Sequence, residues 1–237
     1  MTPAPALVGI SHGTSSEEGQ RAVAGLLEAT SRAHPELIVA QGFVDVQHPD
    51  TAETLAALEP GRAAIIVPLL LSAGYHVHVD LAKAVAAETG RRVTLAHPLG
   101  PDDRLVQVLR ARLAAVDFGI GDELVLAVAG SSDPRAVADC HVIAERLALA
   151  VRRKVTIGFL AAVEPRLDEA ITSTRAAHPG SRIVVSSYLL APGYFQQLAE
   201  AAGGDATTAP ILTPDEPAPQ HIVDLVVDRY HVANSVI

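Results

Sequence analysis

The sequence predicts an α/β protein built from two similar halves, each a four-stranded parallel sheet flanked by helices. Two observations predict it. Short β-rich runs alternate with amphipathic stretches along the chain, and the landmarks of the first half return in the same order in the second. The 237 residues, of which 49% are hydrophobic and 19% charged, are enough to bury a sizeable core.

The strands of the first half are short apolar segments, expected at Ala6–Ser11, Leu37–Asp45, Ala63–Leu71 and Val93–Leu99. Helices are expected between them, at about Glu17–His34, Thr51–Leu58, His76–Gly90 and Asp102–Val116. The apolar run of the third strand is typical of a strand buried on both faces. Pro68 is awkward in a fully central strand, because proline donates no ladder hydrogen bond.

After Val116 a linker is expected, and the same plan then begins again. The recurring landmarks are Gly42 and Gly158, Phe43 and Phe159, Gly74 and Gly193, and Pro98 and Pro210. Each pair is separated by about 115 residues. We therefore expect two domains, at residues 1–117 and 121–237.

Composition excludes several classes of function. The 27 acidic residues exceed the 18 basic ones, and aromatic residues make up only 3% of the chain, which argues against a nucleic-acid partner. The single cysteine, Cys140, can form neither an intramolecular disulfide nor a thiolate cluster, and we expect it to be a small buried residue. The sequence contains no glycine-rich nucleotide motif, so no nucleotide is expected.

The longest apolar stretch, residues 63–71, is far shorter than the roughly 20 residues of a membrane span. Met1–Pro5 has no basic region of the kind that opens a secretory signal. The sequence therefore predicts a cytoplasmic protein without a membrane partner.

Ionisable residues at the predicted strand ends occur in the first half but not in the second. The aligned pairs are His12 and Ala129, Asp45 and Ala161, His76 and Phe195, and His97 and Ala209. A requirement of the fold would apply to both halves, whereas chemistry is needed only once. We therefore interpret these positions as functional in the first half.

Their placement supports this interpretation, because open parallel sheets carry ligand sites beyond the carboxyl ends of their strands. A flavodoxin-like strand order, 2-1-3-4, would put His12 and His76 beside one cleft. Neutral imidazoles bind first-row divalent metals, and Asp45 could add a ligand or accept a proton. Two histidines and one acid leave coordination positions open, which suits a metal in transit.

The loops beside these residues are candidate anion-binding loops. Gly13, Thr14 and Ser15 precede a helix, and Ser72, Gly74 and Tyr75 follow the third strand. Backbone N–H groups and helix dipoles there could hold carboxylates. Helix capping explains the same residues equally well, because serine and threonine are preferred caps.

Three motifs now resemble a known family. They are Ser11-His12-Gly13-Thr14, then Gly42-Phe43-Val44-Asp45 followed by Pro49, and Pro68-Leu-Leu-Leu-Ser-Ala-Gly-Tyr-His76-Val-His78-Val-Asp80. They resemble the sirohydrochlorin cobaltochelatase/ferrochelatase family, the class II tetrapyrrole chelatases. The resemblance covers nearly the whole chain as two fused chelatase-like halves, with a catalytic first domain and a degenerate second one.

The resemblance implies that His12 and His76 are the metal-binding and catalytic pair. It implies insertion of Fe2+ or Co2+ into a sirohydrochlorin-type tetrapyrrole, for siroheme or cobalamin, without nucleotide hydrolysis. Two pyrrole N–H protons must leave as the metal enters, and histidine titrates in the range that this requires. Asp45 stands where the family commonly has glutamate, and it would orient a histidine or shuttle a proton.

His78 and Asp80 would support the metal-binding histidines. His97 remains open between lining the site and an ordinary loop position. Nickel, iron and cobalt are not distinguished, because all three accept imidazole. Two halves in one chain favour a monomer, since the contact between halves is then internal.

Two alternatives remain. A divalent-metal carrier or sensor would bind the ion without inserting it into a macrocycle. A histidine phosphatase would also place a histidine such as His12 after a first strand, but that chemistry calls for arginine where Ser11 stands.

Overall fold

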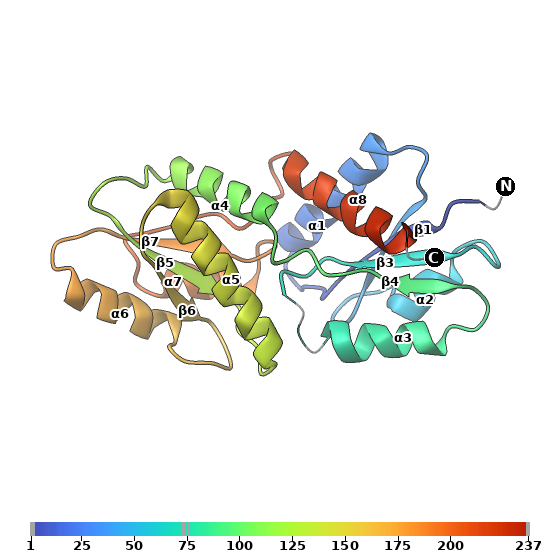
Figure 1. Ribbon diagram of the computed structural model, residues 1–237, viewed down its shortest axis with the longest axis horizontal. Coiled ribbons are helices and arrows are strands. Elements are labelled where there is room, and N and C mark those ends of the chain that lie inside the picture. The colour runs from blue at the N-terminus through green and yellow to red at the C-terminus, as the bar shows by residue number, and fades with distance from the viewer. Residues whose placement is uncertain (1–2, 73, 75, 236–237) are drawn as a thin grey trace.

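The structure, a computed structural model, describes residues 3–72, 74 and 76–235, and the side chains of these residues except those of 76–78. The chain forms two lobes (Figure 1). The strands of the first lobe are β1 (Ala6–Ser11), β2 (Val39–Phe43), β3 (Ala64–Pro68) and β4 (Val93–Leu95), in the order β2-β1-β3-β4. Those of the second lobe are β5 (Glu123–Val128), β6 (Val155–Phe159), β7 (Ile183–Tyr188) and β8 (Ala206–Thr207), in the order β6-β5-β7-β8. Every pairing is parallel, so the predicted fold class is confirmed.

The third strand is buried along its whole length, as its apolar sequence predicts. Its Pro68 pairs with Ile10 of β1, while β4 pairs only with residues 64–66. Pro68 therefore lies beyond the end of the ladder with β4, where its missing N–H costs no hydrogen bond.

The helices of the first half are α1 (Glu17–Ala33), α2 (Thr51–Ala56), the π-helical turn η1 (His76–Leu81), α3 (Ala82–Ala87) and α4 (Asp103–Ala115). The segment expected as one helix from His76 to Gly90 thus begins with a π-helical turn and ends earlier than predicted. Apolar residues of α1 pack against one face of the first sheet, and those of α2 and η1 pack against the other.

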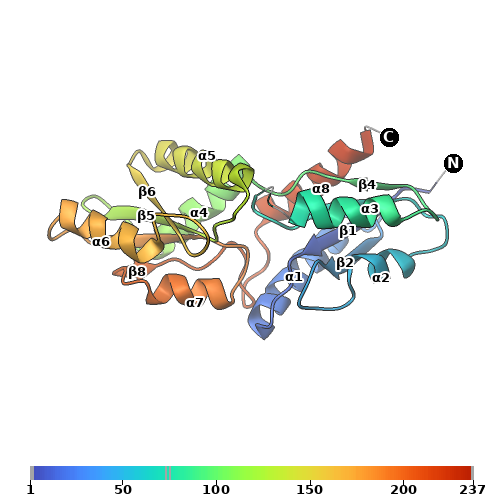
Figure 2. The same ribbon diagram turned by 90° about the horizontal axis from the view of Figure 1, so that it is seen from below.

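The helices of the second half are α5 (Pro134–Val151), α6 (Leu167–Ala177), α7 (Tyr194–Ala201) and α8 (Gln220–Ser235). The second sheet lies between α5 on one side and α6 with α7 on the other, and Figure 2 shows α5 and α7 on opposite sides. No helix in the part of the chain that the structure describes is long and apolar enough to cross a membrane.

The last helix of each half packs on the opposite lobe. Helix α4 contacts α5 and β7 of the second lobe, and α8 contacts α1 and β3 of the first. The expected boundary between residues 117 and 121 therefore describes the sequence repeat, whereas the packing exchanges the terminal helices. The exchange joins the two lobes through one continuous apolar core.

Two arginines hold the crossing segments in place. Arg229 of α8 donates a hydrogen bond of 2.8 Å to the carbonyl oxygen of Pro98, which follows β4. Arg112 of α4 donates one of 3.1 Å to the carbonyl oxygen of Pro210, which follows β8. Each exchanged helix thus binds the segment that crosses in the other direction.

A glycine closes the turn after the first strand of each half. Gly13 has φ +93° and Gly130 has φ +87°, a region that favours glycine. A Cβ atom at Gly13 would collide with the carbonyl oxygen of Asp45, and one at Gly130 would collide with that of Ala161. This requirement of the fold is present in both halves, unlike the histidine that precedes Gly13.

Candidate active site

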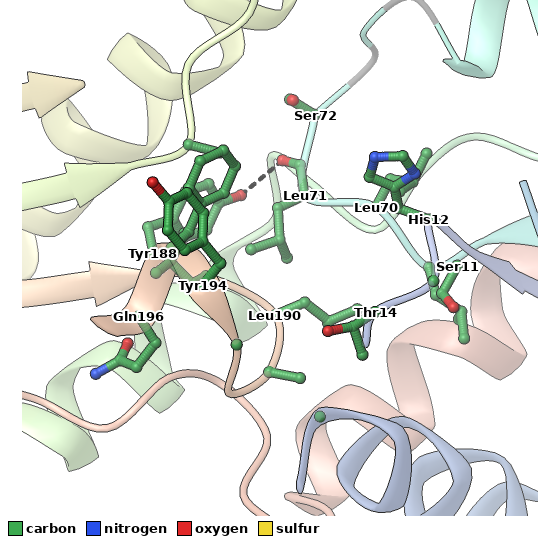
Figure 3. A pocket seen from close by; sticks show the side chains of 18 of the residues that line it. Ser11, His12, Thr14, Leu70, Leu71, Ser72, Tyr188, Leu190, Tyr194 and Gln196 are labelled. Atoms are coloured by element: carbon green, nitrogen blue, oxygen red, sulfur yellow. Dashed lines mark hydrogen bonds between the residues drawn. The ribbon is translucent and has the colours of Figure 1, made fainter. Parts of the chain in front are cut away.

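A cavity of about 680 Å³ lies at the carboxyl ends of both sheets, between the two lobes (Figure 3). Its walls come from the loops after β1 and β3 of the first half and after β5 and β7 of the second. Among the lining residues that the structure describes, none is Asp, Glu, Lys or Arg. The cavity is therefore shaped by apolar and neutral polar groups, together with the imidazole of His12.

His12 is the residue directly after β1, and its side chain is exposed. Its carbonyl oxygen accepts a hydrogen bond of 3.0 Å from the Asp45 N–H, which fixes the backbone at this strand end. Figure 3 shows its imidazole across the cavity from Tyr188 and Tyr194. The predicted position of His12 beside a cleft agrees with this arrangement.

His76 begins η1, but its side chain lies outside the described part of the structure, as do the side chain of His78 and the whole of Tyr75. Of residues 69–75, which precede it, the structure describes 69–72 and 74. Ser72 and Gly74 line the cavity, and the Leu69 N–H donates to the Ile10 carbonyl at 2.8 Å. The pairing of the two histidines therefore stays a prediction.

Asp45 follows β2, and its exposed carboxylate accepts a hydrogen bond of 2.8 Å from the Val46 N–H. It is not among the described residues that line the cavity, and neither is His97, which is also exposed. The Asp45 carboxylate thus stabilises the turn that follows β2. This structural role is an alternative to a catalytic one.

The first candidate anion loop lies against the cavity through Gly13 and Thr14, whereas Ser15 does not line it. Ser16 caps α1, since its hydroxyl accepts a hydrogen bond of 3.3 Å from the Gly19 N–H. Thr14 donates its N–H to the Gln47 side chain at 2.9 Å. Capping and turn contacts therefore use part of the hydrogen-bonding capacity of this loop.

The family model of CbiX matches residues 6–116 and 123–206. The chain belongs to the CbiX family. The resemblance seen in the motifs of the first half is thereby confirmed.

One relative of this CbiX-family chain is the sirohydrochlorin cobaltochelatase of Sulfurisphaera tokodaii, which is 31% identical over 81 residues, 33% of this chain and 68% of the relative. The fold is similar to that of SirB from Bacillus subtilis with Fe3+, with a TM-score of 0.78 and 23% identity over 98% of this chain and 97% of that one. It is also similar to SirB from Bacillus subtilis subspecies spizizenii in complex with cobalt, with a TM-score of 0.74 and 20% identity over 98% and 96%.

The second half of this CbiX-family protein supplies cavity residues that the sequence did not single out: Ser131, Ser132, Tyr188, Tyr194 and Gln196. Phe195, which the sequence named only as the residue aligned with His76, lines the cavity as well. They lie at the strand ends that correspond to the motif positions of the first half. The repeat of Gly74-Tyr75 as Gly193-Tyr194 could have indicated that the segment after β7 also lines the cavity.

The loop after β7 also closes the cavity against the first half. A Cβ atom at Gly19 of α1 would collide with the carbonyl oxygen of Pro192. This glycine therefore permits close contact between the start of α1 and the second half.

Cys140 lines the cavity but is only 6% exposed, and burial raises the pKa of its thiol to about 12. It is a small buried residue, as predicted. Among the described residues, no group of three or more His, Cys, Asp or Glu side chains could hold a metal ion.

Proposed function

We propose that the protein inserts Fe2+ or Co2+ into a sirohydrochlorin-type tetrapyrrole, for siroheme or cobalamin, without hydrolysing a nucleotide. The observation that carries the proposal is the position of His12, an exposed imidazole at a strand end beside a largely apolar cavity between two lobes. Membership of the CbiX family and the activity named for the Sulfurisphaera tokodaii relative support it.

The reaction exchanges two pyrrole N–H protons for one divalent metal ion, so the site must hold the ion and remove both protons. We assign these tasks to His12 and His76, because a neutral imidazole can either ligate a metal or accept a proton. The metal and the macrocycle are both substrates here.

Asp45 would act through a neighbouring group, since its carboxylate already accepts the Val46 N–H. Its N–H donates to the His12 carbonyl oxygen at 3.0 Å, which supports a role for Asp45 in orienting this histidine or in shuttling a proton. His78 and Asp80, in the same π-helical turn as His76, would support the second histidine.

The macrocycle would lie against Gly13, Thr14, Ser72 and Gly74, which line the cavity. Tyr75 would add a contact from the second loop, whereas Ser15, predicted with them, lies outside the described lining. The described part of this wall bears no acidic side chain. It therefore presents no like charge to the carboxylates of the substrate.

The protein would act in the cytoplasm and as a monomer, as the sequence predicts.

An anaerobic assay with purified full-length protein, sirohydrochlorin and either Co2+ or Fe2+ tests the function through the absorbance change of the metallated macrocycle. His12→Ala and His76→Ala are each expected to abolish the accelerated rate. His221→Ala, an exposed histidine of α8, is the matched control.

Unchanged rates in both His12→Ala and His76→Ala would contradict the mechanism. Tight metal binding by the wild type without faster insertion would instead identify a carrier. Comparing the two metals in the same assay decides which ion is the better substrate.

A further inference from the structure

Two aromatic side chains are exposed at the cavity. Tyr194 is 70% exposed and Phe195 is 37% exposed, although the protein contains only four Tyr, four Phe and no Trp. Their ring centroids are 6.1 Å apart and their planes are tilted by 35°. Large aromatic groups are normally buried for stability, so an exposed pair at a cavity indicates a binding surface.

The pair occupies a position that corresponds to the catalytic segment of the first half. Tyr194 and Phe195 begin α7 after β7, and they align with Tyr75 and His76. The second half therefore presents a flat apolar ring where the first half carries an imidazole. A residue that had merely lost its function would not be expected to become a large exposed ring.

The next residue fixes the start of α7. Gln196 is 6% exposed, and its side-chain amide donates hydrogen bonds to the Thr208 carbonyl at 3.1 Å and to Glu200 at 2.8 Å. The aligned residues of the first half, Val77 and Ala96, are apolar. The buried contact with Thr208 ties the first turn of α7 to the residue that follows β8, and so holds the aromatic pair in place.

The charge of the cavity explains why such a surface is needed. The described lining has no Lys or Arg with which to bind a polycarboxylate. Contact with the conjugated ring system is then the main source of affinity that the second half can offer. Stacking on an aromatic side chain needs no charge and excludes water from the macrocycle.

We propose that Tyr194 and Phe195 form a platform on which the flat face of the tetrapyrrole packs, while His12 faces the macrocycle from the first half. Figure 3 shows Tyr194 and His12 on opposite sides of the cavity. This inference rests on the proposed function and deepens it. The second half is then a substrate-binding half, whose lost histidine has been replaced by a stacking surface.

The test compares Tyr194→Ala, Phe195→Ala and Phe195→Leu with the wild type and with Leu149→Ala, which removes an exposed apolar side chain of α5. Binding of metal-free sirohydrochlorin is measured by absorbance titration, and KM and kcat are measured for Co2+ insertion. Each alanine variant should raise the dissociation constant and the KM about tenfold. Neither alanine variant should lower kcat by as large a factor as it raises KM. Phe195→Leu keeps apolar volume without a flat ring and should fall between alanine and the wild type.

Melting temperatures equal to that of the wild type would show that the variants are folded. Unchanged affinity and KM in both alanine variants would overturn the platform and leave the proposed function standing. If the wild type binds sirohydrochlorin, loses affinity in the variants and yet inserts no metal, the platform stands and the proposed function falls. A wild type that neither binds nor metallates the macrocycle would overturn both.

Discussion

Tyr188 donates a hydrogen bond of 2.8 Å from its hydroxyl to the backbone carbonyl of Leu71, which joins β7 of the second lobe to the cavity wall of the first (Figure 3). The ring is 2% exposed, and burial raises the pKa of Tyr188 well above its usual value, so the hydroxyl remains a donor in alkaline solution. The bond ties together the two lobes that must enclose a substrate.

Tyr188→Phe should therefore weaken the contact between the lobes. Losing the donor costs about 1 kcal/mol of stability and lowers Tm by about 2–4 °C. The KM for the macrocycle should rise, because the walls of the cavity are held less firmly. Thermal melting and steady-state kinetics measure the two effects. A variant with the Tm of the wild type would show that this hydrogen bond does not stabilise the contact between the lobes.

The glycine turns separate the needs of the fold from those of the chemistry. Gly13→Ala and Gly130→Ala should each destabilise the protein by about 1–3 kcal/mol, because both glycines have positive φ and lie against a carbonyl oxygen. His12→Ala should leave the free energy of unfolding nearly unchanged, since the side chain is exposed. Urea denaturation of the three variants measures this. An unchanged free energy of unfolding in Gly130→Ala would contradict the claim that both halves require a glycine at this turn.

Asp102 should make the protein sensitive to acid. Burial opposes ionisation of this carboxyl, but hydrogen bonds from Arg104, at 2.8 and 3.0 Å, and the charge of Arg229 outweigh it and hold the pKa of Asp102 below its usual value of 3.8. The stabilisation is present above that usual pKa and is lost as the pH falls through the lowered one. Asp102→Asn should remove about 1 kcal/mol at pH 7 and flatten the fall in stability below about pH 4.

Urea denaturation of the wild type and of Asp102→Asn between about pH 2 and pH 7 checks this dependence. Parallel curves for the two proteins would mean that other carboxyl groups control acid stability. Asp215→Asn, an exposed carboxylate in the segment before α8, is a suitable control.

Cys140 should be unreactive in the native protein. Its thiol is buried and its pKa is raised to about 12, so almost no thiolate exists at pH 8. Alkylation should be on the order of a thousandfold slower in buffer than in denaturant. Mass spectrometry of the labelled chain measures both rates. Rapid labelling of folded protein would show that reagents reach this thiol through the cavity.

Much of the fold was predictable because apolar runs mark buried strands. β1 has the bounds that its sequence predicts, and the strand order follows the expected pattern. The exchange of α4 and α8 was not predictable, because an amphipathic helix can pack on either sheet and only the path of the chain decides between them. The π-helical start of η1 was missed because its apolar spacing is also compatible with an α-helix.

The site was predictable in part for a similar reason. Comparing the two halves identified His12, because the aligned residue of the second half, Ala129, has no imidazole. The same comparison named Phe195 only as the counterpart of His76 that lacks an imidazole, and did not interpret it as a gained aromatic ring. Asp45 was placed at the correct strand end, but sequence could not reveal that its carboxylate accepts the Val46 N–H.

A crystal of the full chain soaked in Co2+ tests the central claim most directly, because anomalous scattering locates the ion. We expect one ion at the cavity, with a nitrogen of His12 and a nitrogen of His76 each about 2.0–2.2 Å away. An ion bound elsewhere, with the two imidazoles too far apart to share a ligand, would contradict the account.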